Sequence, residues 1–363
     1  QGRIFILKES ENIFWYSHKY QNWSHFPDNI DTFFSEIKHK DGLYYCLNFS
    51  EIVIPPSVTT IGKYTFKGFA NLRSISIPSN VTKIKRSAFE GCTSLNKISL
   101  HSSSISASYK SFYGPMNVQF YNDKNCIPKK FFLASTINHI EIASPITMIL
   151  DYAFNRCESL KQITLPSSLI DICVGAFSEC SSLEIISIPS SVEKIGSHSF
   201  LNCKLLKKVT IPSSSRLKMI GKYAFNNCSA LVEITLPSSL NILERGAFKG
   251  CSSLKEISIP PSITQIEKAT FQGCKNLTKV TLHSVNTINE YAFYNCSSLS
   301  QLTIHCVLKD IKKKAFFGCS KIDKLPEITE LTNIEKYAFS KTEIEEMPVY
   351  PLKISKIVEH LFQ

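Results

Sequence analysis

Long apolar runs are absent from this chain of 363 residues. No stretch approaches about 18 consecutive apolar residues, so the sequence offers no candidate for a transmembrane helix. Local catalytic signatures are absent as well: G-x-S-x-G, G-x-x-x-x-G-K-[ST], H-E-x-x-H and C-x-x-C do not occur. These absences argue against an enzyme, and the sequence predicts no cofactor and no metal site.

Cysteine and charge are present in modest amounts. The 13 cysteines are too few for a disulfide-stapled scaffold, and their odd number leaves at least one without an intramolecular partner. A net charge of +11 allows attraction to acidic surfaces without implying nucleic acid. With 43% apolar and 20% charged residues, the chain can form a packed core. Because residue 1 is Gln, we expect a mature product or a fragment, so a signal peptide or an anchor can lie outside this sequence.

A phenylalanine recurs at a fixed spacing along most of the chain. Nine of the twelve intervals are 23 residues, and the others are 19, 25 and 22. Such self-similarity is typical of a repeat architecture, in which each unit is one turn of a solenoid. The thirteen positions are Phe66, Phe89, Phe112, Phe131, Phe154, Phe177, Phe200, Phe225, Phe248, Phe271, Phe293, Phe316 and Phe339.

One repeat unit, from Ile242 to Pro260, can be interpreted physically. Leu254, Ile257 and Ile259 form an L-x-x-I-x-I pattern, which predicts a short strand with one buried face. Pro260 follows at once and ends the strand, because proline cannot donate to a strand ladder. A single unit has too little apolar surface to fold alone, whereas stacked units bury one continuous core.

Ten cysteines follow the same register, three residues before the first strand leucine. Neighbouring coils are about 4.8 Å apart, which exceeds the Cβ separation of about 3.5–4.5 Å in disulfides. We therefore expect a ladder of small, buried, reduced thiols, and a disulfide or metal ladder is the alternative. The members are Cys46, Cys92, Cys157, Cys180, Cys203, Cys228, Cys251, Cys274, Cys296 and Cys319.

The unit I-P-S-S-[VL]-x-x-I-x-x-x-A-F-x-x-C-x-x-L-x-x-I-x-I resembles the BspA-type leucine-rich repeat, also called the 23-residue Treponema-type repeat. The resemblance implies an α/β repeat protein, mainly of short strands and loops, folded as a right-handed leucine-rich-repeat solenoid of about 13 coils. We expect an aromatic-rich N-terminal cap at 1–45, the solenoid at 46–345 with irregular coils at about 101–145, and a C-terminal cap at 346–363. Helices are expected near 30–38 and 352–362.

Two columns of polar residues fall on the exposed side of the predicted strands. The first consists of hydroxyl residues, and the second varies in character, as a partner-specific surface should. A row of small hydroxyls that merely tolerates stacking is the alternative. The hydroxyl column is Ser76, Ser99, Thr164, Ser187, Thr210, Thr235, Ser258, Thr281 and Thr303; the variable column is Ser74, Lys97, Gln162, Ile185, Lys208, Glu233, Glu256, Lys279 and Gln301.

A further column, three residues before each phenylalanine, is basic at seven of eleven positions. Its longest regular run is Lys222, Arg245 and Lys268. This basic stripe is either a solvated ridge or a strip that binds an acidic protein or glycan, since stacked like charges repel unless an anion meets them. The sequence argues against nucleic acid, because no stacking aromatics are interleaved with the charges.

His283, His305 and Cys306 form the best local metal candidate, because both histidines replace the turn proline in consecutive coils. No fourth ligand is identifiable, so solvated turn residues are the simpler interpretation. The resemblance implies a non-catalytic recognition module, adhesin-like, on the cell surface or secreted, binding a protein or a glycan. An intracellular scaffold in the cytoplasm, binding a cytoskeletal or signalling protein, is the alternative that unpaired thiols favour.

Overall fold

A computed structural model of the chain describes residues 6–9, 12–15, 51–54, 58–102, 105–114, 117–324 and 331–344. The chain forms two compact units, Gln1–Leu169 and Ile170–Gln363. Within the described ranges there are strands, turns and loops and no helix, so the helical part of the expected α/β class is not seen there. Both expected helices, most of the N-terminal cap and the whole C-terminal cap lie outside the described residues.

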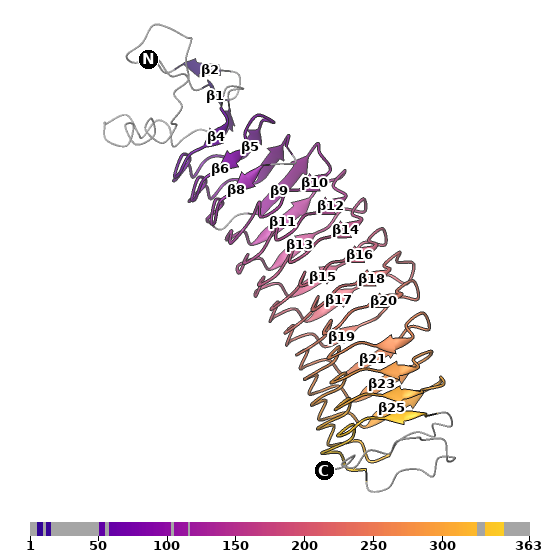
Figure 1. The fold of residues 1–363 in the computed structure, drawn as a ribbon. Helices are drawn as coiled ribbons and strands as arrows, with labels where there is room; N and C mark the ends of the chain where they lie inside the picture. The colour runs from indigo at the N-terminus through magenta and orange to yellow at the C-terminus, as the bar shows by residue number, and fades with distance from the viewer. Residues whose placement is uncertain are drawn as a thin grey trace. The chain divides into compact units, whose positions relative to one another are not determined.

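The first unit carries one long row of parallel strands and a second row of very short ones (Figure 1). At one end of the long row, β1 pairs antiparallel with both β2 and β3. The long row is β2 (Asn12–Trp15), β1 (Ile6–Glu9), β3 (Glu51–Val53), β5 (Ser74–Ile77), β7 (Lys97–Leu100), β9 (Asn117–Asn122), β11 (His139–Ile142) and β13 (Gln162–Thr164). The short strands are β4 (Thr60–Ile61), β6 (Lys83–Ile84), β8 (Ser106–Ala107), β10 (Cys126–Ile127) and β12 (Met148–Ile149).

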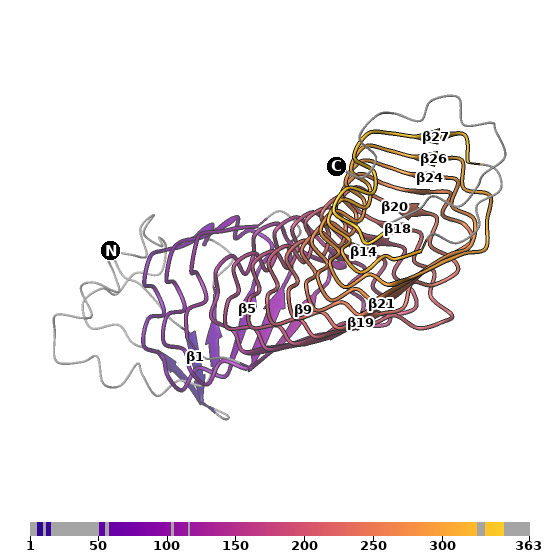
Figure 2. The same cartoon turned by 90° about the horizontal axis from the view of Figure 1, so that it is seen from below.

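The second unit repeats this plan. Figure 2 shows its short strands, such as β20 and β24, on one side of the coils and β19 and β21 on the other. The strands of the exposed face are β15 (Ile185–Ser187), β17 (Lys208–Thr210), β19 (Glu233–Ile234), β21 (Glu256–Ile259), β23 (Lys279–Leu282) and β25 (Gln301–Ile304). The others are β14 (Asp171–Ile172), β16 (Lys194–Ile195), β18 (Met219–Ile220), β20 (Ile242–Leu243), β22 (Gln265–Ile266), β24 (Thr287–Ile288), β26 (Asp310–Ile311) and β27 (Asn333–Ile334).

The fold is a parallel solenoid of about 12 turns, close to the 13 expected. Most of the strands whose side chains are described alternate inward and outward residues, as in β21, where Ile257 and Ile259 are buried and Glu256 and Ser258 are exposed. β21 ends at Ile259, and Pro260 follows, as predicted. The repeat period of the sequence is therefore one turn of the solenoid.

The recurring phenylalanine is the centre of each coil. In the second unit, successive rings from Phe177 to Phe339 stack with centroids 5.1–5.7 Å apart. In the first unit, the prediction that Phe131 is the anchor phenylalanine of its coil is wrong by one residue. Phe132 stacks on Phe154 at 5.1 Å, and its backbone N–H donates to the carbonyl of Ala153, as the N–H of most anchors does to a carbonyl of the next coil.

A hydrogen bond that the sequence pattern does not reveal explains why cysteine recurs at its position in the repeat. Eight fully buried thiols of this cysteine column each donate a hydrogen bond to the carbonyl of the anchor phenylalanine one coil earlier, with Sγ–O distances of 2.9–3.2 Å. Cys46 lies outside the described residues. Burial raises the pKa of the Cys92 thiol to about 12 and that of Cys228 well above its usual range. The donors are Cys92, Cys157, Cys203, Cys228, Cys251, Cys274, Cys296 and Cys319.

A thiol reagent should therefore react with the native protein in two distinct phases. Cys173 and Cys306 are half-buried and should react first, whereas the column thiols should react only when the protein unfolds. Raising the pH to about 9 should not speed the slow phase, because burial keeps these thiols protonated and the thiolate is the reactive form. Mass spectrometry after timed alkylation measures this order. Early modification of Cys228 or Cys251 would contradict the placement of the column.

Two residues in every coil adopt left-handed backbone geometry, two positions before and two after the anchor phenylalanine. Glycine adopts the left-handed conformation at no steric cost, whereas in other residues this conformation costs about 1–2 kcal/mol. The first position is often tyrosine, as at Tyr223 with φ 54°, and the second is often glycine or asparagine, as at Gly250 with φ 74° and Asn227 with φ 59°. The turn is therefore imposed by coil stacking and not by the residue type.

Candidate functional site

The exposed strand face of the second unit carries the predicted columns in the expected register. Glu256, Lys279 and Gln301 lie side by side on β21, β23 and β25. The hydroxyl row Ser258, Thr281 and Thr303 lies beside them on the same strands. On β17 and β19, Lys208 lies next to Glu233, and their charged groups are 2.8 Å apart. The Lys208 ammonium lowers the pKa of Glu233 through that hydrogen bond.

In the first unit the predicted column is wrong. Lys97 is in register with Gln119, Glu141 and Thr164, so Gln162 belongs to a different row, with His139 and Asn117. The cause is the irregular segment: β9 has six residues and pairs with β7 and β11 at positions offset by two. Lys97 and Gln162 therefore do not form one surface row. The hydroxyl column is interrupted at Tyr121, which is in register with Ser99, and Thr164 lies in the row of Lys97.

Two cations of the basic stripe, Lys222 and Lys268, face carboxylates of the next coil. Lys268 Nζ lies 2.6 Å from Glu290 Oε2, which raises the pKa of Lys268 and lowers that of Glu290. The N–H of Lys222 donates to Glu244 Oε2 at 2.9 Å, and the Lys222 ammonium is 3.9 Å from Glu244 Oε1. Each partner lies 22 residues further along the sequence, so comparing positions one coil apart would have found both pairs.

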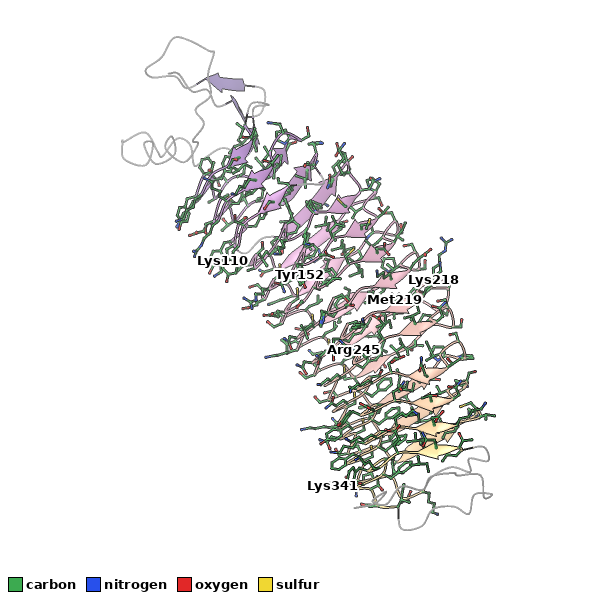
Figure 3. All side chains as sticks on the ribbon, in the orientation of Figure 1. Lys110, Tyr152, Lys218, Met219, Arg245 and Lys341 are labelled. Carbon is green, nitrogen blue, oxygen red and sulfur yellow. The ribbon has the colours of Figure 1, made fainter. Side chains whose placement is uncertain are left out.

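Arg245, labelled in Figure 3, lies over the ring of Tyr223 with 5.7 Å between guanidinium carbon and ring centroid. Lys268 lies 5.6 Å from the ring centroid of Tyr291 in the same way. The premise used against nucleic acid, that aromatics are not interleaved with the cations, is therefore wrong. These rings are half-buried and already covered by cations, so they form a packed ridge and not a row of open stacking platforms.

The metal candidate is only partly assembled. The rings of His283 and His305 stack with centroids 5.5 Å apart, as their adjacent coils predict. The Cys306 thiol instead donates to the carbonyl of Val285 at 3.0 Å, and burial raises its pKa. Among the described residues, no group of three or more His, Cys, Asp or Glu side chains is arranged to hold a metal ion.

A helix long and apolar enough to cross a membrane is not present in the described part of the chain.

Comparison with solved structures supports the fold. A leucine-rich repeat protein from Bacteroides ovatus is 26% identical with a TM-score of 0.60, and the match covers 84% of each chain. One from Eubacterium ventriosum is 24% identical with a TM-score of 0.52, over 83% of this chain and 85% of that one. No curated protein matches this chain.

The family comparison covers far more than half of the sequence. A family model described as "BspA type Leucine rich repeat region (6 copies)" matches residues 37–125, 125–255 and 241–363. The matched ranges include every coil that carries the stacked phenylalanines and the buried thiols. The chain belongs to the BspA-type leucine-rich-repeat family.

Proposed function

We propose that this chain is a recognition module that binds a protein partner, with Glu256, Lys279 and Gln301 at the centre of its contact surface. One observation carries the proposal: these three polar side chains are exposed and adjacent. Within the described part of the chain, Glu256 and Lys279 form no ion pair, unlike Lys208, Lys222 and Lys268. Their charges are therefore available to a partner without breaking an existing ion pair.

The rigidity of the strand face supports this choice. Parallel pairing fixes Glu256, Lys279 and Gln301 at the strand spacing of about 4.8 Å. An extended partner segment can therefore meet several coils at once, without an entropic cost for ordering the backbone of the surface. In leucine-rich repeats the strand face is the usual binding surface, and this family resemblance points to the same side of the coils.

The other candidate residues contribute less in this proposal. Lys208 and Glu233 already satisfy each other, and Lys222, Arg245 and Lys268 are held by carboxylates or a tyrosine ring. An acidic glycan would have to displace those contacts. Lys97 and Gln162 lie in separate rows of the first unit, so each is proposed only as a peripheral contact.

For location, we propose the cell surface or the secreted fraction, as the family resemblance implies, with an adhesin-like role. The alternative is an intracellular scaffold in the cytoplasm. Eight buried thiols that donate to carbonyls favour that alternative, because a reducing compartment preserves free thiols. The first residues of the full-length gene product, and any membrane anchor after this segment, discriminate between the two.

The contact surface is tested by two matched triple variants. Glu256→Ala with Lys279→Ala and Gln301→Ala should weaken binding of a captured protein partner by about tenfold or more, equal to about 1.4 kcal/mol. Lys222→Ala with Arg245→Ala and Lys268→Ala should leave binding within about threefold. Surface plasmon resonance against the same purified partner measures both. The proposal fails if the second variant loses binding while the first retains it.

A further inference from the structure

Three side chains from successive coils of the first unit form a hydrogen-bonded chain on the exposed strand face. Ser76 Oγ lies 3.2 Å from His101 Nε2, and His101 Nδ1 lies 3.1 Å from Asp123 Oδ2. Ser76 is on β5, and His101 and Asp123 directly follow β7 and β9. The backbone N–H of His101 donates to the carbonyl of Ile77 at 3.1 Å, which holds the His101 main chain beside the serine strand.

The order of these contacts has a chemical consequence. A carboxylate that accepts the Nδ1 proton fixes the imidazole tautomer, so the Nε2 lone pair faces the serine hydroxyl. A serine hydroxyl is a poor nucleophile until an adjacent base takes its proton, and this arrangement supplies that base and its orienting carboxylate. We propose that Ser76 is a nucleophile activated by His101, with Asp123 as the positioning residue, and that it transfers acyl groups from small unhindered esters to water.

The proposed reaction balances without a cofactor. Ser76 Oγ attacks the ester carbonyl carbon while its proton passes to His101 Nε2, and a C–O bond forms. The tetrahedral intermediate then expels the alcohol, which leaves with the proton from His101, and an acyl-serine remains. Water, deprotonated by His101, attacks the acyl-serine, releases the carboxylic acid and returns the proton to Ser76. No electron transfer is involved.

The surroundings of Ser76 define the substrate class. Ser76 is exposed on a flat strand face, next in register to Ser99 and then Tyr121. Such a face admits ester groups that project from a surface or a flexible chain, and it selects little for the acyl group. In this proposal the Ser99 hydroxyl donates to the developing oxyanion from the neighbouring strand. Lys124 Nζ is 3.9 Å from Asp123 Oδ1.

The chain contains its own control. Ser258 Oγ lies 3.2 Å from His283 Nε2, the same contact as that of Ser76 with His101. The two serines are 182 residues apart, and so are the two histidines, which corresponds to eight coils. His305 occupies the position of Asp123, and its ring stacks on that of His283. Ser258 therefore has the base without the carboxylate, so the inference predicts low reactivity there.

Labelling the intact chain with a fluorophosphonate probe tests the inference directly. We expect Ser76 to be modified at least about tenfold faster than Ser258, as read by peptide mass spectrometry. His101→Gln should abolish this preference. Asp123→Asn should reduce it by about tenfold, and Asp123→Glu should restore much of it, which a merely structural role for Asp123 would not produce. Equal labelling of Ser76 and Ser258 would overturn the proposal.

Ester hydrolysis gives an independent measurement. Exposed lysines and histidines hydrolyse activated esters slowly, so the comparison is between Ser76→Ala and Ser258→Ala with p-nitrophenyl acetate. We expect Ser76→Ala to remove the initial burst of p-nitrophenol and Ser258→Ala to retain it. A burst that is absent in the unmodified chain, or unchanged in Ser76→Ala, would contradict the mechanism. This inference does not depend on the proposed recognition surface, whose central residues Glu256, Lys279 and Gln301 lie in the other unit.

Discussion

Replacing Phe248 with alanine should lower the free energy of unfolding by about 3–5 kcal/mol. The Phe248 side chain is fully buried, and its ring stacks on Phe225 at 5.4 Å and on Phe271 at 5.7 Å. Removing the ring leaves a cavity between two coils whose backbones are fixed by hydrogen bonds, so the surroundings cannot collapse into it. Urea denaturation measures the loss.

Hydrogen exchange should locate the damage. In a solenoid each coil contacts only its neighbours, so amides of the coils around Phe225 and Phe271 should exchange faster before more distant coils do. Tyr294→Ala is a suitable control, because that half-buried ring stacks on Phe317 at 5.0 Å outside the core and should cost about 1 kcal/mol. Equal losses for the two variants would contradict the assigned role of the phenylalanine column.

Gly221→Ala should be comparably damaging, with a cost of about 3 kcal/mol. A Cβ at Gly221 would lie 2.6 Å from the backbone nitrogen of Ser197 and 2.8 Å from the carbonyl carbon of Gly196. Both atoms are main chain and cannot rotate away, so the neighbouring coils would have to separate. The Gly221 N–H donates to the carbonyl of Ile195 at 2.8 Å, and that separation would strain the same contact.

Gly273→Ala is the control that distinguishes the steric effect of a Cβ between coils from the effect of backbone strain. Gly273 has φ 77°, and a Cβ there would meet nothing closer than 3.9 Å. The left-handed conformation costs an alanine about 1–2 kcal/mol, part of which is offset by the lower entropy of the unfolded chain. We expect a net loss of about 1 kcal/mol in thermal or chemical unfolding. A larger loss for Gly273→Ala than for Gly221→Ala would refute the argument from coil contact.

The sequence predicts the structure of each coil well, because the same kind of residue must recur in every coil to form a buried column. The spacing of the phenylalanines, the proline after Ile259 and the buried cysteines all follow from that requirement. The choice between Phe131 and Phe132 does not, because both rings are fully buried and either satisfies the pattern. The shift at β9 is also hidden, since register depends on the hydrogen bonds of a strand and not on composition alone.

The surface is less predictable, because its residues interact across coils. Counting Lys222 and Lys268 as a free cationic run overlooks Glu244 and Glu290, which lie one coil further along. The same limitation hides Ser76, His101 and Asp123, whose contacts span 25 and 22 residues. A search for local catalytic motifs compares residues that are close in sequence. In a solenoid, residues about one repeat period apart in sequence are close in space.

The pairs Ser76–His101 and Ser258–His283 have a consequence for how the surface of a solenoid can vary. Each pair joins a strand residue to a turn residue of the next coil, 25 residues further along. The residue that follows each histidine by 22 positions differs: it is Asp123 in one unit and His305 in the other. Core positions must keep their residue type because the stacked columns are buried, whereas these exposed positions differ from coil to coil while the coil stays the same. The chemistry of the surface can therefore change one coil at a time without a change in the fold.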